Sequence, residues 1–238
     1  ERLRSALLSS ISHDLCTPLA TILGSVTSLR QLGDRMAPED RADLLAAIEE
    51  ETDRLSRLVA DLLAMTRLEA GLDVLRDWID VGDAAAAAAE HLRRVHPGNA
   101  VRVGRSAEAV VVRGEATLLE QVLFNLGANA VEASPTGAPI DLEVRRDGDA
   151  VVVTLTDRGR GLSAEEIGRL FETDDATPRS DRGSRGGLGL AIARRVVRAM
   201  GGTIAAESRS SAVAGTRVTL RLPSRPPGPA ADVEEEAP

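Results

Sequence analysis

The sequence contains no lysine and no tyrosine, and only one cysteine, one tryptophan and two phenylalanines in 238 residues. All basic side-chain charge is therefore carried by arginine. This excludes a Walker A loop and a serine/threonine/tyrosine kinase fold, because each of them holds nucleotide phosphates with a lysine. The single Cys16 excludes an internal disulfide and is typical of a reducing compartment. No run approaches the roughly 20 apolar residues that a membrane helix needs.

An excess of basic residues is also missing. The formal net charge is -8, whereas a nucleic-acid surface normally shows a basic patch or stripe. We therefore expect a protein or a small molecule as the partner, and no nucleic acid. The chain opens at Glu1 in what reads as helix, without an initiator methionine or a signal peptide, so we expect it to be a piece of a longer protein.

Two long helices are predicted in residues 1–74. Apolar residues recur at spacings of three and four over residues 3–29, before Gly33, and again over residues 44–65, after Pro38. The two helices form an antiparallel hairpin. Because one hairpin cannot cover so long an apolar stripe, we expect it to pair with a second copy in a four-helix bundle, as a homodimer.

A second domain is predicted in residues 75–223, where helices and strands mix without strict alternation. Helices are expected at residues 83–96, 115–133 and 188–200, with a short one after a Ser163/Glu166 capping box, and strands at residues 100–104, 109–113, 140–146, 151–157, 203–208 and 216–222. The mixed order of helices and strands indicates the α+β fold class, with the helical hairpin preceding the second domain. Residues 172–187 are expected to be a lid or a disordered loop, and residues 224–238 a disordered acidic tail.

The segment SSISHDLCTPLATIL, residues 9–23, places a histidine, a carboxylate and a proline in one helix. Helical spacing turns His13 about 200° away from the neighbouring residues of the apolar stripe. Asp14 can polarise the imidazole, and Pro18 removes a backbone hydrogen bond, so we expect a kink that opens this face. A solvated surface histidine and a packing irregularity at the proline are the alternatives.

The helix predicted at residues 115–133 carries two amides, Asn125 and Asn129, on its buried stripe or at its edge. A buried amide needs partners, and either a backbone network or a metal with its phosphates would supply them. In the strand VVVTLTD, Asp157 shares the inward face with the apolar residues, so a donor is expected beside it.

Glycines surround these polar residues. Gly159 and Gly161 follow Asp157 in DRGRG, which lets the backbone approach a ligand closely or makes an ordinary turn. The segment RGGLGLAI, residues 185–192, opens directly onto a helix. Its free N–H groups and the helix dipole form a possible phosphate site, although a glycine-rich helix start is not specific by itself.

The segments HDLCTPL, NLGANA, DRGRG, LFE and GGLGLAI, in this order and behind a helical hairpin, resemble the H, N, G1, F and G2 boxes of two-component sensor histidine kinases. The resemblance covers residues 2–223. Around the first box and in RLVADLLAMTRLEAG the chain is similar to potassium-sensing kinases of the Kdp type. The resemblance implies a dimerisation and histidine-phosphotransfer domain at residues 1–74, followed by an α/β sandwich, a GHKL-type ATP-binding domain, at residues 75–223.

The resemblance also implies residue roles. His13 would accept the phosphoryl group, Asp14 would be its hydrogen-bonding carboxylate, and Thr17 would position a water for phosphatase activity. Asn129 would hold Mg²⁺ and Asp157 would accept from the adenine amino group. The residues implied to bind ATP are Asn125, Asn129, Asp157, Gly159, Gly161, Arg185, Gly187 and Gly189, with Arg179, Arg182 and Arg185 as lid arginines that meet the phosphate charge in place of lysine.

The function implied is that of an ATP-dependent protein-histidine kinase that passes its phosphoryl group to an aspartate of a response-regulator receiver domain and also dephosphorylates that regulator. Such a chain would be cytoplasmic, or the cytoplasmic part of an inner-membrane sensor. Cys16, Glu132 and Ala133 depart from the family pattern, which has basic or aromatic residues there. They motivate the alternative of a catalytically impaired, dimeric, nucleotide-binding scaffold that docks a regulator. A GHKL ATPase of the chaperone or mismatch-repair kind does not account for the H box.

Overall fold

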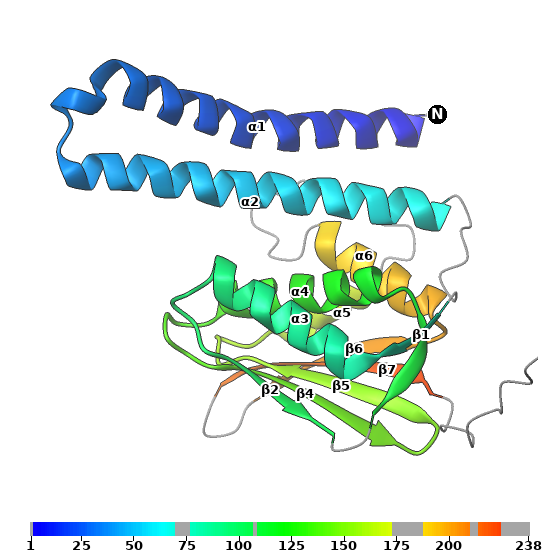
Figure 1. Ribbon diagram of the computed structural model, residues 1–238. Helices are drawn as coiled ribbons and strands as arrows, with labels where there is room; N and C mark the ends of the chain where they lie inside the picture. Colours follow the sequence, from blue (N-terminus) through cyan, green and yellow to red (C-terminus); the bar gives the residue numbers. More distant parts are fainter. Residues whose placement is uncertain (1, 70–76, 107–108, 173–187, 210–213, 225–238) are drawn as a thin grey trace, which may run out of the picture. The chain divides into compact units, whose positions relative to one another are not determined.

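The computed structural model describes residues 2–69, 77–106, 109–172, 188–209 and 214–224 (Figure 1). Most of the lid predicted at residues 172–187 and of the tail predicted at residues 224–238 lies outside this part. The chain divides into two compact units, a helical hairpin and a domain that begins at residue 68. No helix in the described part is long and apolar enough to span a bilayer.

The hairpin consists of α1 (Arg2–Leu32), a short 3₁₀ turn (Gly33–Arg35) and α2 (Pro38–Glu69). Both helices are confirmed, and α1 continues as one helix through Pro18. Pro38 opens α2, with Glu39 and Asp40 in its first turn. A proline is favourable there because its missing N–H would have no partner in the helix, and the two carboxylates favour the positive end of the helix dipole.

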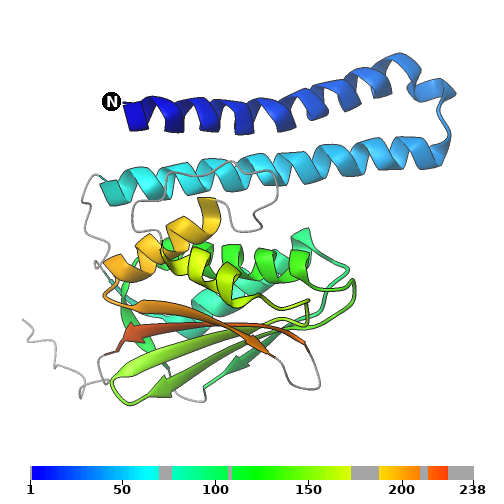
Figure 2. The same cartoon turned by 180° about the vertical axis from the view of Figure 1, so that it is seen from behind.

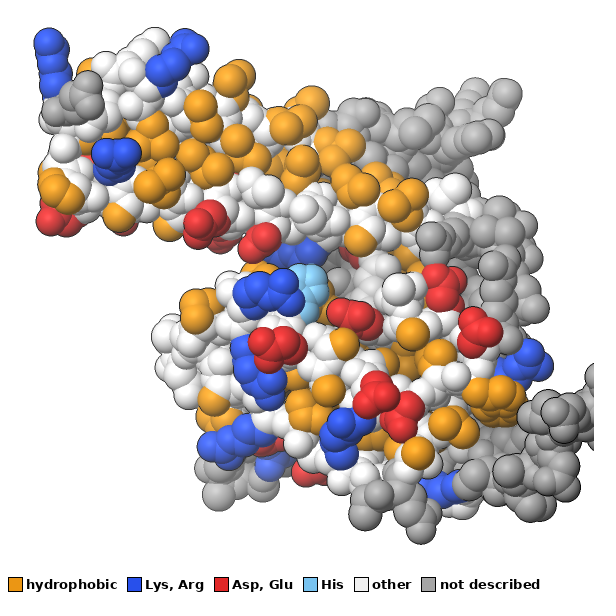
Figure 3. Space-filling model, in the orientation of Figure 1, with side chains coloured by type: hydrophobic (Ala, Val, Ile, Leu, Met, Phe, Trp, Pro, Cys, Tyr) orange, Lys and Arg blue, Asp and Glu red, His pale blue; other side chains and the backbone are white. Residues whose placement is uncertain are grey.

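Large apolar side chains remain exposed on both helices of the hairpin, where Figure 3 shows them as an orange surface. They are Leu19, Leu23, Val26 and Leu32 on α1, and Leu45, Val59 and Leu63 on α2. Leu23 is 68% exposed. An apolar surface of this extent on a helical hairpin is typical of an association surface.

The second unit contains a five-stranded sheet in the order β2-β4-β5-β7-β6. The strands are β2 (Val101–Arg105), β4 (Ile140–Asp147), β5 (Ala150–Thr156), β6 (Thr203–Arg209) and β7 (Gly215–Pro223). β2 pairs in parallel with β4, and all other neighbours are antiparallel. Asp147 still pairs with Ala150, so the β4–β5 turn falls on residues 148–149. Gly148 has φ +61° there.

The helices of this unit lie on one face of the sheet (Figures 1 and 2). They are α3 (Val81–Val95), α4 (Ala116–Ala133), α5 (Ala164–Glu172) and α6 (Leu188–Ala199). The core between the two layers is formed by inward strand residues such as Leu142 and Val153 and by Leu119 and Leu123 of α4, all at most 1% exposed. This two-layer arrangement confirms the α+β class, with a sandwich that follows the hairpin in the sequence.

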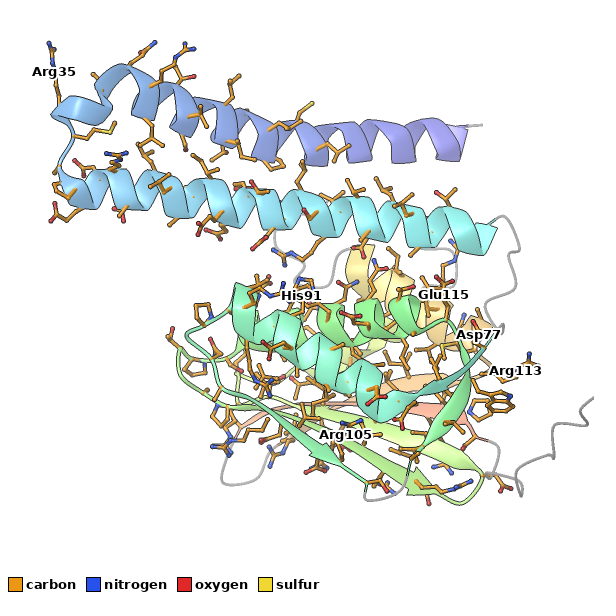
Figure 4. The ribbon with its side chains drawn as sticks, in the orientation of Figure 1. Arg35, Asp77, His91, Arg105, Arg113 and Glu115 are labelled. Carbon is orange, nitrogen blue, oxygen red and sulfur yellow. The ribbon has the colours of Figure 1, made fainter. Side chains whose placement is uncertain are left out.

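A small second sheet pairs β1 (Asp77–Asp80) with β3 (Val111–Gly114). β1 was not predicted, because aspartates at both ends of a four-residue strand give little β propensity. The Arg113 guanidinium lies 5.8 Å from the centre of the Trp78 ring across this pair (Figure 4). Asp80 then caps α3 by accepting from the Gly82 and Asp83 N–H groups, so α3 begins at Val81, two residues earlier than expected.

Candidate active site

Asp157 follows β5 at the end of its inward row and is 4% exposed. Its Oδ1 accepts hydrogen bonds from the Gly159 N–H and the Thr216 N–H, both at 2.8 Å. The donors expected for this buried carboxylate are therefore present. Among the described residues, its Oδ2 accepts no hydrogen bond. One oxygen thus holds the loop and the neighbouring strand, and the other is left for a further donor.

Thr216 is a site residue that sequence reasoning missed. It is 6% exposed, and besides donating to the carboxylate its carbonyl accepts from the Asp157 N–H at 3.0 Å. A Cβ on the preceding Gly215 would collide with the Asp157 carbonyl. The only sequence signal was a Gly-Thr pair at the start of a predicted strand, and this pattern does not show which strand lies beside it.

The two glycines of DRGRG are required by packing within the domain. A Cβ on Gly159 would collide with the carbonyl oxygen of Ala133, in the last turn of α4. Gly161 has φ +77° and lies against the Ser208 hydroxyl of β6, which accepts from the Leu162 N–H at 3.2 Å. This loop is therefore clamped between α4 and β6.

The asparagines lie on one side of α4. Asn125 is 8% exposed, as the helical spacing predicted, and Asn129 is half-buried. Between them Gly127 packs so closely on Leu92 of α3 that a Cβ would collide with it. Since two residues turn a helix by about 200°, this contact directs both amides to the side of α4 away from α3. A glycine in a helix interior, which costs about 1 kcal/mol, was the available signal for such a contact.

The phenyl ring of Phe124, on α4 next to Asn125, provides a second contact with α3. The His91 imidazole stacks on it with 4.2 Å between ring centres and 28° between planes (Figure 4). Phe124 is 4% exposed. The rotation of α4, and with it the direction of the amides, is therefore fixed by two contacts.

Gly189, in the first turn of α6, lies against the Asn125 amide. A Cβ there would come within 3.1 Å of the Asn125 Nδ2 and 3.2 Å of its Cγ. The contacts of Gly189 with Asn125 and of Gly159 with Ala133 are eight residues apart on α4, about 12 Å at 1.5 Å per residue. Asn129 lies midway. Two segments distant in sequence, the DRGRG loop and the start of α6, thus meet α4 along its length.

The capping box predicted at the start of α5 is confirmed. The Ser163 N–H donates to Glu166 Oε2 at 2.8 Å, and the Glu166 N–H donates to Ser163 Oγ at 3.1 Å. Arg160, from the DRGRG segment, pairs with both oxygens of Glu166. The hydrogen bond from the Arg160 guanidinium and then that from the Ser163 N–H lower the pKa of Glu166 to about 2.

The remaining predicted residues are described only in part. His13 and Asp14 lie on α1, but their side chains fall outside the described part, as do Gly187 and the lid arginines, Arg179, Arg182 and Arg185. Thr17 and Cys16 are exposed on the same helix. Glu132, at the end of α4, is exposed as well. The structure therefore assembles the residues of the second unit and leaves the histidine segment as a prediction.

Two family models match the chain in the predicted order. The model "His Kinase A (phospho-acceptor) domain" matches residues 3–71. The model "Histidine kinase-, DNA gyrase B-, and HSP90-like ATPase" matches residues 114–226. The chain belongs to the sensor histidine kinases. The second match covers the α4, β5, α6 and β7 segments that meet at Asp157 and Asn125 in this chain.

Curated relatives agree with this assignment. Sensor protein KdpD of Clostridium acetobutylicum is 33% identical over 214 residues, which are 89% of this chain and 24% of that protein. Sensor protein KdpD of Mycobacterium tuberculosis (strain H37Rv) is 36% identical over 211 residues, 87% of this chain and 24% of that protein. The chain thus spans 24% of the length of these relatives. The similarity to Kdp-type kinases is consistent with the prediction.

A solved structure shares the fold of the second unit. The mycobacterial sensor histidine kinase MprB superposes with a TM-score of 0.54 at 27% identity, covering 63% of this chain and 98% of that chain.

Proposed function

We propose that this chain is the catalytic core of an ATP-dependent protein-histidine kinase in a two-component system, with the histidine-phosphotransfer domain at residues 1–74 and the ATP-binding domain at residues 75–223. The proposal rests on two contacts along α4. The loop that follows the buried Asp157 carboxylate packs on Ala133, and the glycine-rich start of α6 packs on Asn125. The match of a phosphoacceptor-domain model to the hairpin supports it.

The base would bind at Asp157. Its Oδ1 is engaged by two N–H groups, which leaves Oδ2 to accept from the adenine amino group, and Gly159 and Gly161 would line the base. The triphosphate would extend along α4 toward Asn125 and Gly189. The start of α6 would offer N–H groups to it, together with Gly187 and the lid arginines, Arg179, Arg182 and Arg185.

The amide oxygens on α4 fit a magnesium ion. Asn129 is half-buried beside the proposed phosphate path, and carboxamide oxygens are hard ligands suited to Mg²⁺. Asn129 would hold the ion with Asn125 nearby. When bound, Mg²⁺ would neutralise phosphate charge, which is part of how phosphoryl transfer is catalysed without a lysine.

The phosphoryl group would pass from ATP to His13. One imidazole nitrogen attacks the γ-phosphorus with its lone pair, the new P–N bond forms as the bond to the bridging oxygen breaks, and ADP leaves while the other imidazole nitrogen releases its proton to solvent. Asp14 would orient the imidazole and take its N–H hydrogen bond. A carboxylate oxygen of a receiver-domain aspartate then attacks phosphorus and the P–N bond breaks. For the dephosphorylation of the regulator, Thr17 would position the water that hydrolyses the acyl phosphate on the receiver-domain aspartate.

Dimerisation would cover the exposed apolar side chains of the hairpin. Pairing the exposed leucine and valine side chains of two copies would build a four-helix bundle. The receiver domain of a response regulator would then dock against the helices that carry His13.

The test is incubation of the purified chain with γ-labelled ATP and Mg²⁺, alongside His13→Ala and Asn129→Ala. We expect label that survives alkali and is lost in acid in the unmutated chain, and none in either variant. His96→Gln and Asn99→Ala, which change the same residue types outside the proposed site, should keep it. Full labelling of His13→Ala would refute the proposal.

Binding of ATP measured by calorimetry separates the alternative function. If the chain binds ATP but gains no label, either the departures at Cys16, Glu132 and Ala133 have removed phosphoryl transfer, as in the scaffold function, or a sensor region is needed to license the transfer. If Asn129→Ala binds Mg²⁺-ATP as well as the unmutated chain does, the proposed magnesium ligand is wrong.

A further inference from the structure

The outer face of the five-stranded sheet, opposite the helices, carries a groove of about 570 Å³. Its lining residues come from four strands and the loop after β5: Asp141, Glu143, Arg145, Thr154, Thr156, Arg158, Glu207, Arg209, Arg217 and Thr219. In the described part of the chain no helix covers this face (Figures 1 and 2). The groove lies outside the proposed active site.

Strand register explains the shape of the groove. Thr154 pairs with Thr219, and Thr219 pairs with Ala205, so a row of short side chains crosses β5, β7 and β6, and Glu143 of β4 pairs with Thr154 at its end. The next row on one side contains Arg145 and Arg221, on either side of Val152. The next row on the other side contains Asp141, Thr156, Arg217 and Glu207. The hydroxyl groups of Thr154 and Thr219 therefore form a trough with arginines on both banks, and on this second bank the Arg217 guanidinium is already paired with Glu207 at 3.0 Å.

Some of this positive charge is unpaired or weakly paired. Arg209 makes no ion pair among the described residues, and Arg145 approaches Asp147 only to 3.9 Å. Arg158 lies 3.8 Å from Asp141, a long contact for an ion pair. Because exposed pairs of this kind contribute about 0–1 kcal/mol each, the guanidinium groups can exchange them for another carboxylate at little cost.

The chain carries an acidic segment close enough to reach this groove. Residues 232–236 read DVEEE, with four carboxylates in five residues. If the segment is extended, Asp232, Glu234 and Glu236 share one face at intervals of about 6.6 Å. We propose that residues 232–236 dock in the threonine trough of the same molecule, with their carboxylates accepting from the arginines on its banks and from the Thr154 and Thr219 hydroxyls.

The position of Ser224 makes an intramolecular contact feasible. Its N–H donates to the Asp149 carbonyl and its hydroxyl to the Val111 carbonyl, so the chain leaves the sheet at a fixed point beside the β4–β5 turn. The trough at Thr219 is five residues back along β7, about 17 Å. Residues 225–231 can span at most about 25 Å, and the Pro-Gly-Pro at residues 227–229 permits the reversal of direction.

The experiment uses the full chain and a chain that ends at Ser224, with methyl NMR signals of Thr154 and Thr219 as the readout. We expect these signals to differ between the two proteins and to return toward the full-chain positions when a peptide of residues 225–238 is added to the shortened chain. The full-chain positions should move toward the shortened-chain ones between about 0.05 M and about 0.5 M salt, because exposed charge contacts are screened.

Charge reversal tests the occupant and its place. Arg145→Glu with Arg209→Glu, both outside the proposed nucleotide machinery, should weaken peptide binding about tenfold or more, whereas Arg94→Glu on α3 should leave it unchanged. A peptide with NVQQQ in place of DVEEE should not bind. Equal affinity of the double variant, or identical Thr signals in both chain lengths, would overturn the proposal. Signals that depend on protein concentration would overturn it in favour of docking on a second copy.

Discussion

Asp157 combines a structural and a ligand-binding role that two substitutions can separate. Asp157→Ala removes the oxygen that accepts from the Gly159 and Thr216 N–H groups and leaves two buried donors without it. Hydrogen bonds to charged groups contribute about 1.5–3 kcal/mol each, so the loss should be about 3–6 kcal/mol. Because a domain is stable by only about 5–15 kcal/mol, Asp157→Ala should be close to unfolding.

Asp157→Asn keeps an oxygen for the same two donors, but it places an NH₂ group where the proposed adenine contact needs an acceptor. It should cost about 2 kcal/mol or less in stability and should still abolish detectable ATP binding. Urea unfolding followed by the fluorescence of Trp78, the single tryptophan and a residue of the same domain, measures the first effect, and calorimetry measures the second. An Asp157→Ala protein as stable as the unmutated chain would refute the structural reasoning, and normal ATP binding by Asp157→Asn would refute the base contact.

Two further predictions concern the loop and helix beside this carboxylate. Gly159→Ala should destabilise the domain by about 2–3 kcal/mol, because its Cβ meets the Ala133 carbonyl. The control Gly104→Ala, whose Cβ would have Glu143 Cγ at 3.5 Å, should be nearly neutral in the same urea assay. Equal unfolding midpoints of the two variants would contradict the packing argument. The lowered pKa of Glu166, about 2 against 4.5 when unperturbed, means that its charge stabilises α5 above about pH 4.5 and that this contribution is lost as the pH falls toward 2. NMR titration of the Glu166 carboxyl should therefore have a midpoint near 2 that rises in Arg160→Ala, and an unchanged midpoint would show that the ion pair is not the cause.

Local patterns predicted the parts of the site that depend on one element. Period-two alternation placed Asp157 inward, helical spacing placed Asn125 on the buried side of α4, and the Ser163/Glu166 capping box was read directly. In each of these cases the spacing of residues along one strand, helix or turn decides the geometry. Every helix of the second unit was found in the same way, and α3, α4 and α6 begin and end within two residues of the predicted bounds.

The residues that were missed depend on contacts between distant segments. Thr216 is a site residue only because β7 lies beside β5, 59 residues away from Asp157 in the sequence. Ser208 holds the DRGRG loop across 46 residues. β1 exists because β3 pairs with it. No period within a single segment contains this information, and strand pairing is what a single sequence leaves least determined.

The glycines of the DRGRG segment show why a motif and a binding site are not the same statement. The sequence suggested that Gly159 and Gly161 admit a ligand, but Gly159 is already required by the Ala133 carbonyl and Gly161 by its positive φ and the Ser208 hydroxyl. A loss of activity on substituting either glycine would therefore follow from misfolding of the loop alone. Only a residue whose packing contacts survive the substitution, as those of Asp157 do in Asp157→Asn, can assign nucleotide binding to an atom. For this reason the Asp157 pair of variants tests the proposed site more directly than any glycine substitution.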